Sequence, residues 1–255
     1  MNDEGRILIL DLARGVTQRL PGAGQNVGGW SPDGSRVVFN VIGDTARNLF
    51  WQLADGSEPP ERLTESPQQQ FGGPVLPDGS ALIFVSGANL LRLDLEQPGH
   101  EPTSLLAEAF EERYPAPSPD GRWLAYASNE SGDWEVYVRA YPRLDGKQQI
   151  SRDGGSMPAW SPDGRELFYM TPKAVDREYA IMAVNVSLTP SFRASTPREL
   201  FRGRFLYADQ LRTYDVHPDG RFLMIEDDEE RPTHGSLRIV LNWFDELERL
   251  VPRNE

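Results

Sequence analysis

The sequence predicts an all-β protein, a β-propeller built from four-stranded antiparallel blades. The tripeptide Pro-Asp-Gly occurs five times, with its aspartates 45, 42, 43 and 56 residues apart. An apolar run rich in β-forming residues follows each copy. A repeat of about 40 to 50 residues is the length of one propeller blade. The aspartates of the five copies are Asp33, Asp78, Asp120, Asp163 and Asp219.

Each residue of the tripeptide has a role in a tight turn. Proline fixes φ at the second position, the aspartate side chain can accept a bond from the backbone two residues on, and glycine adopts a positive φ. Such a turn joins the two inner strands of a blade. We therefore interpret the five aspartates as structural turn residues on separate blades, and not as one constellation of carboxylates.

A further strand and a short closing segment follow each inner hairpin. Strand-like runs at 49–51, 90–93, 136–138 and 181–184 are short and apolar on both faces, as expected for blades that pack against two neighbours. We expect one propeller domain over 1–255. Its predicted parts are a half-blade at 5–20, blades at 25–65, 70–108, 113–151, 156–202 and 212–242, and a C-terminal helix at 243–251.

The half-blade at 5–20 leaves the closure of the propeller open. In a closed ring of five blades, the N-terminal pair would complete the blade begun by 213–226 and would remove exposed strand edges. Residues 237–241 also have the composition of a strand and compete for that place. Alternatively, the chain is a fragment of a longer propeller, or an incomplete gene product without an independent role.

The charge and composition narrow the choice of partners. The net charge is −13, and Lys and Arg form no cluster, which argues against nucleic acid or an anionic membrane surface as a partner. The first residues lack the features of a signal peptide, and no apolar run approaches the roughly 20 residues that span a bilayer. Cysteine is absent, so no disulfide can form. We expect a monomer that does not insert into a membrane.

The sequence offers little for catalysis, and we assign no catalytic residue, metal ligand or cofactor. His100 and His234 have no second ligand at metal spacing, and His217 takes the place of the serine that precedes three of the Pro-Asp-Gly copies. The acidic stretch 227–230 lacks the order of a calcium loop. We therefore expect that the chain is not an enzyme. The alternative is a propeller-type lyase or glycan hydrolase with its site at the channel mouth.

The expected function is recognition of a protein partner or another ligand at one mouth of the propeller. The segments that lead into the innermost strands ring this mouth. They are mixed in character and include arginine and tyrosine, which are favoured at binding hot spots. The predicted contact residues are Asn26, Phe71, Arg113, Tyr114, Met157, Arg212 and Tyr214.

Two copies of the repeat carry a family resemblance. Residues 30–34 and 160–164 both read Trp-Ser-Pro-Asp-Gly, and 129–138 form a matching second hairpin. Over residues 5–242 the chain resembles the TolB-like propellers, also called PD40 repeats, which implies a bacterial source.

The C-terminal half resembles a subgroup of these propellers, the one that follows the kinase domain in bacterial membrane-spanning serine/threonine kinases. The resemblance implies a sensing or interaction domain on the periplasmic or extracellular side. No kinase motif and no membrane segment is found in the sequence. The chain would be at most the propeller part of such a kinase. The residues that carry this resemblance are 134–141, 164–169, 197–201, 214–216 and 241–244.

Overall fold

The structure, a computed structural model, describes most of the chain. The described residues are 7–11, 14–21, 24–43, 46–97, 99, 101–172, 178–189, 191–227 and 239–240. All their regular secondary structure is β-strand. The helix predicted at 243–251 lies outside them, as do His100, His234 and most of the acidic stretch 227–230. The chain divides into two units, Met1–Pro117 and Ser118–Glu255, which are described separately.

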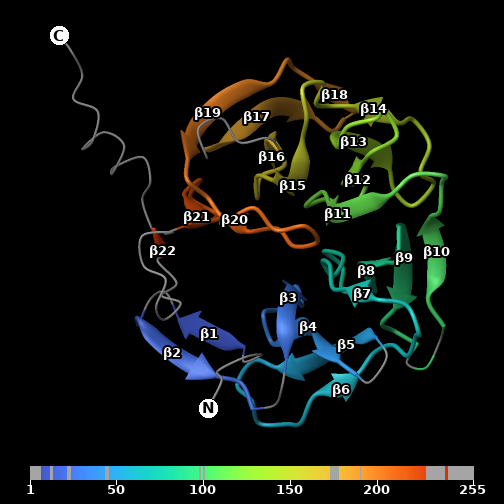
Figure 1. Ribbon diagram of the computed structural model, residues 1–255, viewed down its shortest axis with the longest axis vertical. Coiled ribbons are helices and arrows are strands. Elements are labelled where there is room, and N and C mark those ends of the chain that lie inside the picture. The colour runs from blue at the N-terminus through green and yellow to red at the C-terminus, as the bar shows by residue number, and fades with distance from the viewer. Residues whose placement is uncertain are drawn as a thin grey trace. The chain divides into compact units, whose positions relative to one another are not determined.

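The first unit contains two four-stranded antiparallel sheets, each corresponding to one blade (Figure 1). In each sheet the four strands lie in chain order, as the repeat predicts. The first sheet is β3 (Gln25–Trp30), β4 (Arg36–Ile42), β5 (Arg47–Leu53) and β6 (Glu61–Arg62). The second is β7 (Gln70–Phe71), β8 (Ala81–Ser86), β9 (Asn89–Asp94) and β10 (Thr103–Leu106).

A two-stranded hairpin begins this unit, and a single strand ends it. The strands β1 (Leu8–Asp11) and β2 (Val16–Arg19) pair with each other as a sheet of two. The residues that flank this hairpin, Ile7 and Leu20, are buried with residues of β4, which attaches the hairpin to the first blade. The strand β11 (Glu112–Pro117) ends the unit and packs against β8 and β9.

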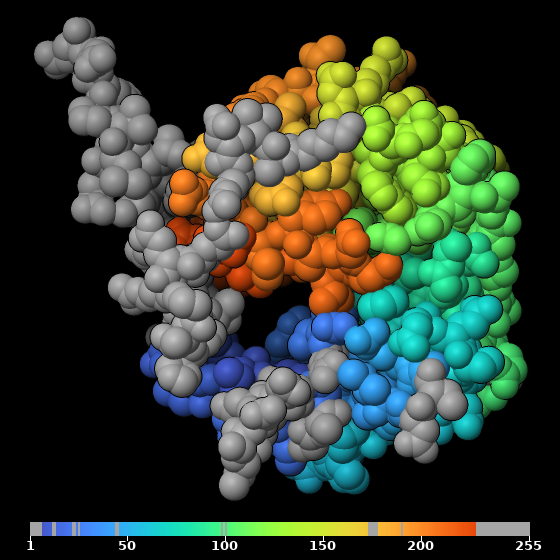
Figure 2. All heavy atoms as spheres, viewed as in Figure 1, coloured from blue at the N-terminus to red at the C-terminus, as the bar shows by residue number. Residues whose placement is uncertain are grey.

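The core of the first unit lies where the two blades meet. All six residues of β8 are buried, and its Leu82 and Phe84 join Val38 and Leu49 of the first blade in one apolar cluster. The strands β7–β10, drawn teal to green, lie beside the strands β3–β6, drawn blue to cyan (Figure 1), and the atoms of the two blades adjoin in the space-filling view (Figure 2). Glycine makes the closest approach possible, because a Cβ on Gly28 would lie 2.5 Å from the carbonyl carbon of Gly72.

The second unit continues the same pattern. The strands β12 (Trp123–Ser128), β13 (Glu135–Ala140) and β14 (Gln148–Gln149) pair in this order. The next sheet contains β15 (Ser156–Trp160), β16 (Glu166–Met170), β17 (Tyr179–Ser187), β18 (Arg193–Ala194) and β19 (Arg198–Gly203). The long strand β17 pairs with β18 through Val186 and Ser187, near its C-terminal end, and with β19 through residues 179–183.

The last sheet shows where part of the predicted strand at 237–241 lies. The strand β20 (Tyr214–Val216) pairs with β21 (Phe222–Ile225), and β22 (Ile239–Val240) pairs with the other side of β21. The described part of 237–241 therefore occupies the place beside β21.

The Pro-Asp-Gly turns have one geometry in all five copies. The glycine φ lies between 68° and 86°. Its N–H donates to the carbonyl three residues earlier at 2.8–2.9 Å. The aspartate Oδ1 accepts the backbone N–H two residues further on at 3.0–3.2 Å. These bonds are local in sequence, so the tripeptide itself specifies the inner hairpin.

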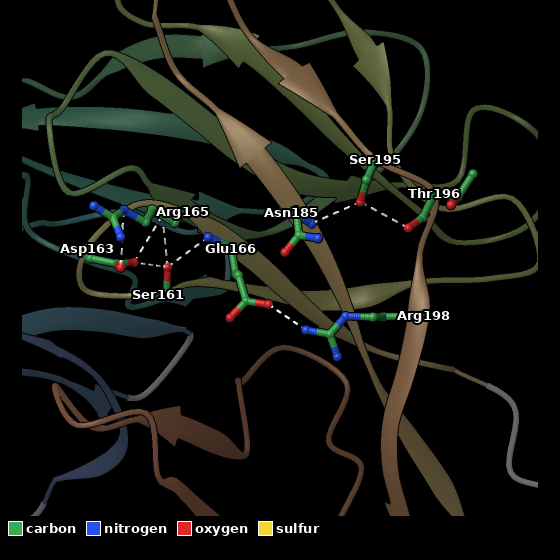
Figure 3. A network of polar contacts seen from close by, with 8 residues as sticks. All are labelled: Ser161, Asp163, Arg165, Glu166, Asn185, Ser195, Thr196 and Arg198. Carbon is green, nitrogen blue, oxygen red and sulfur yellow. Dashed lines mark hydrogen bonds and ion pairs between the residues drawn. The ribbon is translucent and has the colours of Figure 1, made fainter.

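Serine completes the turn in three copies, as the one at Ser161 illustrates (Figure 3). Its Oγ donates to Asp163 at 2.7 Å and accepts the backbone N–H of Glu166 at 2.8 Å. Glu166 in turn accepts a bond of 2.7 Å from Arg198 of β19. In the last copy, His217 Nδ1 lies 2.7 Å from Asp219 Oδ1, so His217 replaces the serine as a turn residue.

Candidate binding site at the start of the innermost strands

The structure places all seven predicted contact residues at or just before the start of an innermost strand. Six lie among the first three residues of β3, β7, β11, β15 or β20, and Arg212 lies two residues before β20. The first unit carries Asn26, Phe71, Arg113 and Tyr114, and the second carries Met157, Arg212 and Tyr214.

Three of these residues have an unusual backbone. Asn26, Tyr114 and Met157 have φ values of 51°, 53° and 53°, in the left-handed region that residues other than glycine seldom adopt. The pairing register is irregular beside Asn26 and Met157. A bulge of this kind redirects a side chain out of the strict alternation of a strand. Such strain costs of the order of 1 kcal/mol or more and persists only where the surroundings hold it.

In the second unit, two of the predicted residues support each other inside the protein. Met157 is fully buried and Tyr214 nearly so, and the Tyr214 phenol donates a hydrogen bond of 2.8 Å to the Met157 carbonyl oxygen. Burial raises the pKa of the Tyr214 phenol, so it remains a donor at neutral pH. Arg212 is exposed and pairs with Asp215 at 3.0 Å.

In the first unit, a backbone hydrogen bond holds the start of β11. The N–H of Glu112 donates to the carbonyl of Ala88, in the turn between β8 and β9, at 2.8 Å. Tyr114 is buried, whereas the Arg113 side chain is partly exposed and pairs with Glu111 at 2.6 Å. A ligand that approaches this unit from solvent therefore meets Arg113 before Tyr114.

Sequence reasoning missed two residues that surround Phe71. Arg47, the first residue of β5, donates to the Gln69 side-chain oxygen from its backbone N–H at 3.2 Å and from its guanidinium at 3.4 Å. The guanidinium carbon lies 5.7 Å from the centre of the Phe71 ring, within the range of a cation–π contact. The predicted topology carried a signal for Arg47, because β3 and β5 of an antiparallel blade begin at the same edge.

A buried polar network holds the start of β7 beneath Phe71. The Asn40 side chain donates to the carbonyl of Gln70 and accepts the N–H of Gly72 at 3.3 Å. Thr64 Oγ1 accepts the N–H of Leu49 at 3.0 Å and donates to the Gln70 side chain. Asn40, Thr64 and Gln70 are all buried. The backbone on both sides of Phe71 is therefore fixed before any ligand arrives.

The same edge of the first unit exposes two apolar side chains. Ile42, which ends β4, is 52% exposed, and Phe110, which lies just before β11, is 43% exposed. We call this set of residues the lead-in edge. It consists of Ile42, Arg47, Gln69, Phe71, Phe110 and Arg113. The lead-in edge combines aromatic, aliphatic and guanidinium groups, the composition typical of protein interfaces.

The described residues contain neither a candidate metal site nor a candidate membrane-spanning helix. No group of three His, Cys, Asp or Glu side chains that could hold a metal ion occurs in this part of the chain. No helix there is long and apolar enough to cross a membrane.

The chain is similar to known proteins in its fold and not in its sequence. No protein-family model matches the sequence, and no curated protein is similar to it in sequence. Among solved structures, a protein assigned as TolB from Agrobacterium tumefaciens superposes with a TM-score of 0.64 at 19% identity, over 79% of this chain and 75% of that one. TolB from Acinetobacter baumannii gives 0.60 at 13% identity, over 87% and 57%.

An oligogalacturonate lyase from Vibrio parahaemolyticus is also similar, with a TM-score of 0.57 at 13% identity, over 93% of this chain and 82% of the lyase. At these identities the likeness concerns the fold. Together with the all-β sheets and the repeated turns, it shows that this chain has a β-propeller fold similar to that of the TolB structures.

Proposed function

We propose that this chain is a non-catalytic binding propeller that contacts a protein partner through the lead-in edge. The observation that carries the proposal is the group of exposed apolar side chains and guanidiniums on a backbone fixed by buried hydrogen bonds. A preformed backbone lowers the entropy lost on binding. Solvent-accessible Phe71, Phe110 and Arg113 supply anchors of the kind that dominate interfaces.

Selection from a displayed random-peptide library on the immobilised full chain tests this proposal. Peptides that bind the wild type should bind Phe71→Ala and Arg113→Ala at least about tenfold more weakly, because each change removes a contact worth about 1–2 kcal/mol. Leu8→Ala and Arg14→Ala are the matched controls, since their exposed side chains lie on the β1–β2 hairpin. Equal losses in the controls and the edge variants would count against the proposal.

A finer form of the proposal follows the resemblance to membrane-spanning kinases. In that form the propeller is the sensing part of a receptor, on the periplasmic or extracellular side, and its partner regulates the kinase. The genomic sequence immediately upstream tests it. An open frame that continues into a kinase and a membrane span supports the receptor, and an in-frame stop with a ribosome-binding site directly before Met1 contradicts it.

One observation favours a second function, that of a lyase or glycan hydrolase. Glu112 begins β11 beside Arg113, and only 1% of it is exposed, so a shielded carboxyl group lies at the candidate site. Buried carboxyl groups serve as general acids or bases in such enzymes. The test is incubation with oligogalacturonates and other acidic oligosaccharides. Turnover that disappears in Glu112→Gln would replace the binding proposal, and no turnover in either protein would remove this alternative.

A further inference from the structure

Arg47 differs in its partners from five other arginines of the first unit. In the described part of Met1–Pro117, the guanidiniums of Arg14, Arg36, Arg62, Arg92 and Arg113 each lie within 3.7 Å of a carboxylate. The acceptor for Arg47 is instead the neutral amide oxygen of Gln69. Its Nε is buried and has no acceptor among the described residues. The lead-in edge therefore contains a partly buried guanidinium that no described carboxylate neutralises.

The neighbours of Arg47 restrict what could neutralise it. The Phe71 ring lies 5.7 Å from the guanidinium carbon. Ile42 is the cross-strand partner of Arg47, so the two side chains project from the same face of the blade. Ile42 is more than half exposed. A ligand at Arg47 therefore meets a cation, an aromatic ring and an aliphatic side chain together.

The chemistry of the guanidinium selects the ligand. Its planar fork of N–H donors fits a carboxylate, which can accept two parallel bonds. A phosphate dianion would require further cations, and Arg113, the other guanidinium of the lead-in edge, is already engaged by Glu111 at 2.6 Å. We infer that Arg47, with Phe71 and Ile42, binds a peptide carboxylate that lies next to an apolar side chain. This inference rests on the proposed function and specifies the chemistry of its partner.

Because of the overall charge of the chain, this site attracts an acidic ligand only at short range. A net charge of −13 repels an acidic peptide at a distance, so recognition depends on contact with the guanidinium itself. The carboxylate has two possible sources, a C-terminus or an Asp or Glu side chain. Both present the same group to Arg47, and the test must separate them.

Titration of the isotope-labelled full chain with three capped dipeptides is the test. N-acetyl-Leu-Glu amide carries only a side-chain carboxylate, N-acetyl-Leu-Gln acid only a terminal one, and N-acetyl-Leu-Gln amide neither. The backbone amide resonances of Gln69 and Phe71 report binding. We expect saturable shifts with one or both acidic peptides, and at least about tenfold weaker binding of the neutral one. Equal binding of all three peptides would overturn the inference.

Variants identify the group responsible. Arg47→Gln should weaken the acidic peptides about tenfold or more and leave the neutral peptide unaffected, and Arg47→Lys should fall between, because it keeps the charge and loses the fork. Arg14→Gln, whose side chain is 82% exposed, is the charge-matched control and should bind as the wild type does. Wild-type affinity in Arg47→Gln would overturn the inference.

A failure of the carboxylate inference can be distinguished from a failure of the proposed function. Library-selected peptides that depend on Phe71 and Arg113, but carry no acidic group and ignore Arg47→Gln, would leave the binding proposal intact and remove the carboxylate. Selected peptides that ignore all three residues would remove the binding proposal itself.

Discussion

The phenol of Tyr214 donates a hydrogen bond of 2.8 Å to the carbonyl oxygen of Met157, 57 residues earlier in the chain. The bond joins the start of β20 to the start of β15, and both residues are buried. Met157 has the left-handed φ of 53°, so its carbonyl points in a direction that a regular strand would not give it. A long-range bond therefore fixes a strained residue in the second unit.

Tyr214→Phe should destabilise the protein by about 1–3 kcal/mol, because it leaves the buried Met157 carbonyl without its donor. Equilibrium unfolding in urea measures the change. Tyr179→Phe is the matched control, since its ring stacks on Tyr207 and its hydroxyl makes no hydrogen bond among the described residues. A cost no larger than that of the control would show that the bond does not hold this site.

Gly121→Ala should destabilise the protein by about 1 kcal/mol through backbone conformation alone. Gly121 has a φ of 68°, and an added Cβ would meet no atom within 4 Å outside its own residue and its two chain neighbours, so overlap with the rest of the protein cannot contribute. Gly121→Asn should cost less, since asparagine tolerates this region. Equal stability of the wild type and the alanine variant in urea would contradict the turn geometry.

Asp33 should make stability depend on pH in a predictable window. Bonds from the Ser31 hydroxyl, and from the backbone and hydroxyl of Ser35, lower the pKa of Asp33 to about 2, from 3.8. A lowered folded-state pKa contributes stability that is present above the unfolded pKa and is lost as the pH falls through the folded one.

The stability difference between the wild type and Asp33→Asn should therefore be constant from pH 7 to about pH 5 and shrink between about pH 4 and pH 2. Urea unfolding of both proteins across this range measures it. A difference that does not change with pH would mean that the carboxylate charge has no part in the turn.

Phe192→Ala should destabilise the protein by about 3–5 kcal/mol and change its tryptophan fluorescence. The buried Phe192 ring packs between Trp123, at 5.3 Å, and Trp160, at 6.2 Å edge to face. Phe192→Leu should cost less, because it fills most of the space. An alanine variant with wild-type stability and fluorescence would show that these contacts are not formed.

The fold could be predicted from the sequence because its signals are local. The turn at Asp163 is made by bonds from Ser161 and from the backbone of Arg165, all within four residues. Short apolar runs after each glycine then specify the second strands. The same reasoning explained His217, which stands in a repeat position and bonds to the turn aspartate.

The details of the candidate site depend on contacts that are distant in sequence. The positions of the seven contact residues followed from the repeat, but burial of Tyr114, Met157 and Tyr214 depends on packing that the repeat does not encode. Arg47 lies 22 residues from Gln69, and no motif links them. The left-handed backbone of Tyr114 had no signal in residue type, whereas position 26 holds asparagine, which tolerates this region.

The most direct test of the central claim is to map where a library-selected peptide binds on the full chain by amide chemical shifts. Binding at the lead-in edge predicts the largest shifts at residues 69–71 and 110–113, with little change at the Pro-Asp-Gly turns on the opposite edge of the blades. Shifts concentrated at those turns, with residues 69–71 and 110–113 unmoved, would contradict it.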